Sequence, residues 1–173
     1  DSPRDYATWD SAYVALAERS IQALEARGVD AIVGLTHLDL GVDRQIAALR
    51  ATHPKLIWIA GGHEHFLIHE PLTDGTAAIT KGDSNARRVW QVVLGRQGGR
   101  PALRADSVPL DGSVAVDPAY RRDVEQRWAA RMREKIPFFD QVIGRSDTRM
   151  DASEEVVLNE ESAWGDWLAD QMR

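Results

Sequence analysis

The stretch AIVGLTHLDLGVDRQIAALRATHPKLIWIAGGHEH, residues 31–65, decides the fold of this chain. It contains two short apolar runs, 31–35 and 56–60, and each is typical of a buried β-strand. The segment 43–50 between them has an apolar helical face, and Asp43 is a candidate N-cap for that helix. A strand, a helix and a second strand predict a right-handed βαβ unit with parallel strands.

Three histidines follow the two predicted strands. His37 comes after the first apolar run, and His63 and His65 come after the second. Loops that leave parallel strands emerge at one edge of the sheet, so we expect the three imidazoles to converge there. In an extended loop His63 and His65 would also point to the same side. A single histidine at a strand end is more often structural, but three at one edge favour a metal site.

A carboxylate could complete such a site. Asp39 or Asp43, with the three histidines, would give a mononuclear zinc centre, because catalytic zinc commonly has three protein ligands and one open position. The interpretation we prefer from the sequence is that Asp43 caps its helix and that Asp39 lies on the loop surface. Glu64, between two histidines, is expected to point away from the metal and receives no catalytic role.

These motifs resemble a known enzyme family. Gly34-Leu35-Thr36-His37, an aspartate six residues later, and Gly61-Gly62-His63-Glu64-His65 after the next strand resemble the second half of a calcineurin-like metallophosphoesterase domain of the 5'-nucleotidase branch. Residues 79–94 resemble the strands that follow this loop in the family, and residues 140–173 resemble the start of its C-terminal domain. The resemblance covers nearly the whole chain, which corresponds to a middle slice of the family.

The resemblance implies a fold and a division into domains. The expected fold class is α/β (α+β), a partial metallophosphoesterase sandwich with a βαβ unit, antiparallel hairpins and a linker helix. Residues 1–116 would be the C-terminal half of the metallophosphoesterase domain, and residues 117–138 the linker helix. Residues 139–173 would be the truncated start of the 5'-nucleotidase C-terminal domain.

The resemblance also implies a chemistry, hydrolysis of a nucleotide or other phosphomonoester by two divalent metal ions that activate a bridging water. Zinc, manganese, magnesium and calcium are all compatible. His37 and His63 would bind one metal and His65 the other. The ligands that the family's first half supplies are missing here, so the expected partner is that N-terminal half. The chain alone would bind metal weakly and be inactive, and no catalytic residue is assigned in it.

Two alternatives come from other classes of protein. One is a non-catalytic binding or scaffolding module. The other is a complete mononuclear zinc hydrolase built on the three histidines and a carboxylate. The parent protein is expected to be a metal-dependent phosphatase under the main interpretation, and the family resemblance alone suggests that it is periplasmic or extracellular.

Composition narrows the class of protein. With 43% hydrophobic and 28% charged residues, the chain of 173 residues has an ordinary globular composition. A formal net charge of −6 argues against nucleic acid or an anionic membrane as a partner. No apolar run approaches the ~20 residues of a membrane span, and no signal peptide is visible. Because cysteine is absent, a metal must use histidine, carboxylate or amide ligands.

The remaining elements follow from local patterns. Apolar spacing predicts a helix over 6–27, and turn residues predict hairpins over 66–81 and 88–110. Asp117-Pro118 should open a helix that Pro137 ends, followed by a strand over 140–146. A helix over 160–172 should bury Trp164, Trp167 and Leu168. We expect His53, His69 and Lys81 to be solvated.

Overall fold

A computed structural model of the protein describes residues 6–142 and 144–173. The chain divides into two units, residues 1–115 and 116–173, which are described separately. The assignment of these units to domains of a family stays a prediction. Among the described residues, no helix combines the length and the apolar character that crossing a membrane requires.

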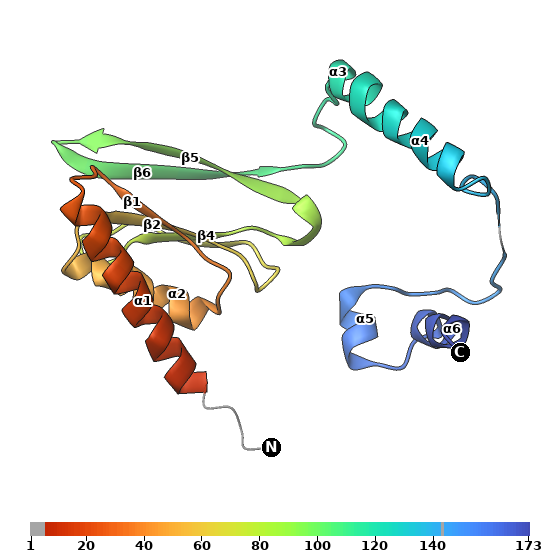
Figure 1. The fold of residues 1–173 in the computed structure, drawn as a ribbon, viewed down its shortest axis with the longest axis horizontal. Helices are drawn as coiled ribbons and strands as arrows, with labels where there is room; N and C mark the ends of the chain where they lie inside the picture. Colours follow the sequence, from red (N-terminus) through yellow and green to blue (C-terminus); the bar gives the residue numbers. More distant parts are fainter. Residues whose placement is uncertain (1–5, 143) are drawn as a thin grey trace. The chain divides into compact units, whose positions relative to one another are not determined.

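A four-stranded sheet forms the centre of the first unit (Figure 1). Its strands are β1 (Ile32–Leu35), β2 (Leu56–Gly61), β3 (Ile68–Glu70) and β4 (Ala78–Lys81), arranged in the order β1-β2-β4-β3. β1, β2 and β4 are parallel, and β3 is antiparallel to β4. The predicted parallel strand pair and the first hairpin are therefore confirmed. β1 forms one edge of the sheet, and Leu35 at its end is 89% exposed.

Two helices pack on the sheet and complete the core. They are α1 (Tyr6–Ala26) and α2 (Leu40–Ala48), and a short 3-10 turn, η1 (Leu49–Ala51), extends α2. Ile21 of α1 and Ile46 of α2 belong to one buried cluster with Ile32, Leu56 and Ile59 of the strands. Gly28, just beyond α1, has φ of 76°, a left-handed conformation that glycine adopts without strain, as expected at a helix C-terminus.

A long antiparallel hairpin continues the first unit. It consists of β5 (Arg88–Gln97) and β6 (Arg100–Pro109), after a short 3-10 turn, η2 (Ser84–Ala86). The second predicted hairpin is confirmed, although the pairing extends further toward the turn than expected. Trp90 of β5 reaches the four-stranded sheet, since its Nε1 donates to the carbonyl of Lys81 at 2.9 Å and its ring lies 5.1 Å from that of His69. His69 is exposed, as predicted.

The sequence expectations about the start of α2 and about His53 are wrong. α2 begins at Leu40 with Asp39 in the N-cap position, so Asp43 lies inside the helix and does not cap it. His53 is buried instead of solvated, because its Nδ1 lies 2.8 Å from Oε2 of Glu25 at the end of α1. Both residues have a partner that is distant in the sequence.

The second unit is helical in its described part. α3 (Pro118–Tyr120), a π-helical turn η3 (Arg121–Gln126) and α4 (Arg127–Lys135) follow one another, and the Asp117 carboxylate caps the start by accepting from the amide of Ala119 at 2.8 Å. The predicted helix over this region and its end before Pro137 are confirmed. α5 (Glu154–Asn159), which the sequence did not predict, and α6 (Ala163–Gln171) complete the unit.

Two expectations fail in this unit. Residues 140–142 and 144–146 form no strand, and residue 143 lies outside the described residues. A strand needs a neighbour to pair with, and the second unit offers only helices in its described part. Trp167 and Leu168 are 39% and 45% exposed, so they do not form a buried side of α6. Trp164 stacks on Trp167 with a centroid separation of 5.5 Å.

Candidate metal centre

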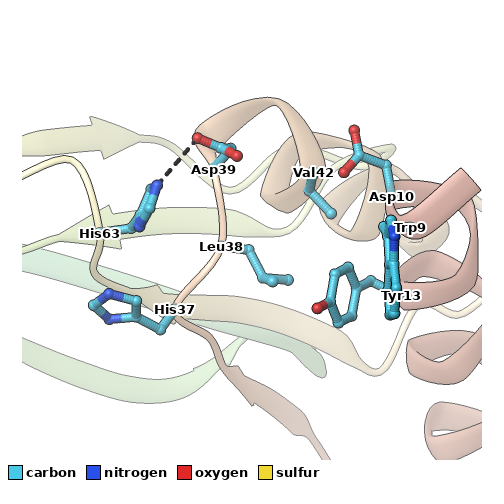
Figure 2. A pocket seen from close by; sticks show the side chains of 8 residues that line it. All are labelled: Trp9, Asp10, Tyr13, His37, Leu38, Asp39, Val42 and His63. Atoms are coloured by element: carbon cyan, nitrogen blue, oxygen red, sulfur yellow. Dashed lines mark ion pairs between the residues drawn. The ribbon is translucent and has the colours of Figure 1, made fainter. Parts of the chain in front are cut away.

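His37 and His63 meet at one edge of the central sheet. β1 and β2 end in register, with Leu35 opposite Ala60, and the amide of Thr36 donates to the carbonyl of Ala60 at 3.0 Å. Both histidines follow these last paired residues, and their ring centroids lie 5.4 Å apart with the planes at 82°. The structure therefore brings together two of the three predicted ligands (Figure 2).

Asp39 joins this pair. Its Oδ1 lies 3.2 Å from Nε2 of His63, as the dashed line in Figure 2 shows. Although Asp39 occupies the N-cap position of α2, its side chain makes no capping hydrogen bond and is 77% exposed. Asp39 is therefore on the exposed surface, as the sequence predicted, and its carboxylate also lies beside an imidazole.

The loop that carries His63 and His65 has a left-handed backbone at both histidines. φ is 94° at His63 and 60° at His65. Such values are uncommon outside glycine and cost on the order of 1–3 kcal/mol each, so surrounding contacts must hold them. The loop is not the extended one from which we expected both histidines to point to the same side. His65 does not line the pocket described below, and its role as a metal ligand stays a prediction.

A pocket of about 390 Å³ opens beside the histidines. Leu38 and Val42 contribute aliphatic side chains to its lining, and α1 contributes aromatic ones. The lining residues are Trp9, Asp10, Tyr13, His37, Leu38, Asp39, Val42 and His63. In Figure 2 the side chains of Trp9 and Tyr13 lie together, with Leu38 between them and the histidines. The pocket thus has imidazole and carboxylate groups that suit a cation at one end, and aromatic side chains with the carboxylate of Asp10 beside them at the other.

A buried ionic cluster lies within the elements that carry the site. Lys81, at the end of β4, is fully buried, and its Nζ lies 2.8 Å from Oδ2 of Asp43 and 2.6 Å from Oε2 of Glu64. The same Nζ donates to the carbonyl of Leu38 at 2.6 Å. The expectation that Lys81 is solvated is wrong, because the buried carboxylate of Asp43 offers the ammonium a partner inside the fold. Sequence reasoning missed this cluster, and its only signal was a lysine that directly continues an apolar strand.

Glu64 connects the histidine loop to this cluster and to α2. It accepts hydrogen bonds from the Lys81 ammonium and from the amide of Leu40. Burial acts to raise the pKa of Glu64, but the hydrogen bonds from Lys81 and from the backbone amides of Glu64 and Leu40, together with the Lys81 charge, outweigh it. The net result is a pKa below the ordinary value, so the side chain is ionised near neutral pH.

The two glycines of the loop permit close approach. A Cβ on Gly61 would lie 3.0 Å from Oδ2 of Asp43 and 3.0 Å from Cε of Lys81. A Cβ on Gly62 would lie 3.1 Å from Nδ1 of His37. Neither glycine has a positive φ, so the need is for space and not for an unusual backbone.

The side chains of His37, His63 and Asp39 could supply a part of the coordination sphere of a metal ion. Imidazole nitrogens and a carboxylate suit zinc or manganese, but catalytic zinc commonly takes three protein ligands and two metals need more. Within residues 6–142 and 144–173, no group of three or more His, Asp or Glu side chains is arranged to hold a metal ion. His37, His63 and Asp39 therefore form an incomplete site. Asp43, considered for a mononuclear centre, is paired with Lys81.

Comparison with known proteins places this geometry in context. No family model and no curated protein matches the chain. A solved structure of the sulfate thiohydrolase SoxB from Thermus thermophilus, in complex with glycerol, is similar over 75% of this chain and 22% of that chain, with 26% identity and a TM-score of 0.56. The chain has a mixed α/β architecture consistent with a partial metallophosphoesterase fold.

A second solved structure is more distant. It is a putative 5'-nucleotidase from Staphylococcus aureus in complex with alpha-ketoglutarate, with 16% identity over 67% of this chain and 26% of that chain and a TM-score of 0.45. Both neighbours are hydrolytic enzymes by name. The chain spans about a quarter of the length of each, so activity, substrates and partners of a whole protein belong to the proposal that follows.

Proposed function

We propose that this chain forms part of the metal site of a divalent-metal-dependent hydrolase whose substrates are phosphomonoesters, nucleotides first among them. The observation that carries the proposal is the meeting of His37 and His63 at 5.4 Å beyond two paired parallel strands. Two histidines from separate loops at this edge, with a carboxylate beside one of them, supply a part of the ligand set that a metal site in an α/β fold requires.

Each residue has a role under this proposal. His37 and His63 would hold one divalent metal, and His65 the second. A bound metal would supply a nucleophilic water at neutral pH and neutralise charge on the phosphoryl oxygens. Asp39 orients the His63 ring and adds negative charge beside it, which favours a cation. The aromatic end of the pocket accommodates the part of the substrate that does not react.

The remaining ligands would come from an N-terminal half of the domain, as the resemblance to the 5'-nucleotidase branch implies. On its own, this chain would then bind metal weakly and hydrolyse little substrate. Export of the parent protein stays a prediction of that resemblance.

A second candidate activity is hydrolysis of a thiol-linked sulfonate with release of sulfate. The similarity to a sulfate thiohydrolase at 26% identity favours it. Phosphoryl and sulfonyl centres both carry anionic oxygens that a metal can neutralise, so one metal site could serve either reaction.

Metal binding and substrate choice can be tested together. Calorimetric titration of the chain with Zn²⁺ and Mn²⁺ should show binding that His37→Ala weakens at least tenfold and that His69→Ala, at an exposed histidine outside the motif, leaves within twofold. Assays on the chain combined with an N-terminal half should release phosphate from a nucleoside monophosphate. Sulfate release from S-sulfocysteine would favour the second candidate, and equal binding by both variants would contradict the metal site.

A further inference from the structure

The proposed reaction does not use the buried ammonium of Lys81. An ammonium without partners inside a protein is strongly unfavourable, so its contacts define its role. Its Nζ donates hydrogen bonds to the carbonyl of Leu38 and to the carboxylate of Glu64, and it forms an ion pair with the carboxylate of Asp43. All three contacts of the ammonium therefore lie within the protein.

Two of the three partners of the ammonium are adjacent to residues of the candidate metal centre along the chain. Leu38 lies between His37 and Asp39, and Glu64 directly follows His63. One ammonium therefore connects the two loops whose histidines meet. Asp43 fixes the other side of the ammonium to α2, which begins immediately after Asp39.

The backbone of the second loop explains why such an anchor is needed. His63 and His65 both have positive φ, and Glu64 lies between them. A strained conformation persists only where its surroundings hold it. The Glu64 side chain is held from two sides, by Lys81 and by the amide of Leu40.

We propose that Lys81 is a positioning residue: through the Leu38 carbonyl and the Glu64 carboxylate, it holds His37 and His63 at the separation that a shared metal requires. The metal part of this inference rests on the proposed function. The part of the inference that Lys81 holds the strained loop is independent of the proposed function, and it can be measured without metal.

A nearby ion pair provides a matched control. Arg44 of α2 contacts Glu70 of β3, so this pair also joins α2 to the segment after the histidine loop, but Arg44 is 59% exposed. Glu70→Gln removes the same charge as Glu64→Gln, from an exposed pair. Salt bridges of this kind contribute little to stability.

The experiment compares three variants with the native chain. Glu64→Gln weakens the contact between Lys81 and residue 64 and leaves the ion pair of Lys81 with Asp43. The triple variant Asp43→Asn, Glu64→Gln and Lys81→Met makes the cluster neutral, so that it leaves no uncompensated buried charge. Glu70→Gln is the control. Each variant is titrated with Co²⁺, followed by its visible absorption, and the amide hydrogen exchange of residues 61–65 is measured without metal.

The expected result separates positioning from general stability. Glu64→Gln and the triple variant should bind Co²⁺ about tenfold more weakly or worse, as outer-sphere substitutions do, while their far-UV spectra remain native. Exchange at residues 61–65 should accelerate at least tenfold in both. Glu70→Gln should change neither quantity by more than twofold. A merely structural role for Lys81 would lower the melting temperature and leave Co²⁺ affinity below the melting transition unchanged.

The two proposals fail in different ways. If the folded triple variant keeps native Co²⁺ affinity and native exchange at residues 61–65, the positioning role is wrong. If the native chain binds no Co²⁺ but the exchange difference is present, the loop is held as described and the metal function is wrong.

Discussion

The Nζ atom of Lys81 lies 2.8 Å from Oδ2 of Asp43, and neither side chain is exposed to solvent. A lysine and an aspartate in this position stabilise the fold only as a pair, because either one alone would be an uncompensated buried charge. The pair joins the end of β4 to the middle of α2, under the loops that carry His37 and His63.

Removal of the Lys81 charge alone should strongly destabilise the fold. Lys81→Met leaves Asp43 and Glu64 without their cation, and we expect the free energy of unfolding to fall by about 3–5 kcal/mol. Urea unfolding followed by circular dichroism measures this. Arg44→Met, at an exposed ion pair with Glu70, should cost about 1 kcal/mol or less. Equal losses in the two variants would contradict the buried pairing.

A methyl group at Gly61 should disturb the same cluster. The added carbon would lie 3.0 Å from both Oδ2 of Asp43 and Cε of Lys81, so these atoms must move. We expect Gly61→Ala to destabilise the protein by about 1–3 kcal/mol, as overpacking does. Gly82→Ala is the control, because nothing lies within 4 Å of the position that its Cβ would take. Thermal melting compares the two, and a neutral Gly61→Ala would show that the cluster tolerates displacement.

Glu64 should make stability depend on pH. Its pKa is lower in the folded protein than in the unfolded chain, so the unfolded chain takes up a proton first as the pH falls. The stabilisation is therefore complete above the ordinary glutamate value, about pH 4.3, and is lost as the pH falls through the lower, folded value. The difference in unfolding free energy between the native chain and Glu64→Gln should shrink from pH 7 to pH 3. A difference that is constant over this range would contradict the assignment.

His53 should contribute to stability although it lies outside the metal motif. Its Nδ1 is 2.8 Å from Oε2 of Glu25, and its side chain is 11% exposed. His53→Ala removes a buried hydrogen bond and leaves a gap, so we expect a loss of about 1–3 kcal/mol by urea unfolding. His69→Ala, at an exposed histidine, should cost less than about 1 kcal/mol. The reverse order would contradict the assigned burial.

Local patterns in the sequence predicted much of the first unit. The apolar runs at 31–35 and 56–60 indicated two parallel strands, and the parallel pair placed His37 and His63 at one edge. Asp-Gly and Gly-Gly pairs marked both hairpins. These features depend on neighbours in the chain, so their signals are local.

Other features depend on partners distant in the sequence. Lys81 is buried because Asp43 and Glu64 receive its charge, and His53 is buried because Glu25 lies beside it. Neither pairing has a local pattern. A distant partner also explains the error in the predicted start of α2. Aspartate is a common helix cap, so the sequence placed Asp43 at the helix start, but its side chain is buried inside the fold.

The position of β1 at an edge of the sheet has a practical consequence for work with this chain. Val33 and Leu35 of this strand are 42% and 89% exposed, and an edge strand with exposed apolar side chains is a template for pairing with another polypeptide. Concentrated samples should therefore self-associate through strand pairing. The substitution Leu35→Lys would oppose such aggregation and keep the chain monodisperse for measurement.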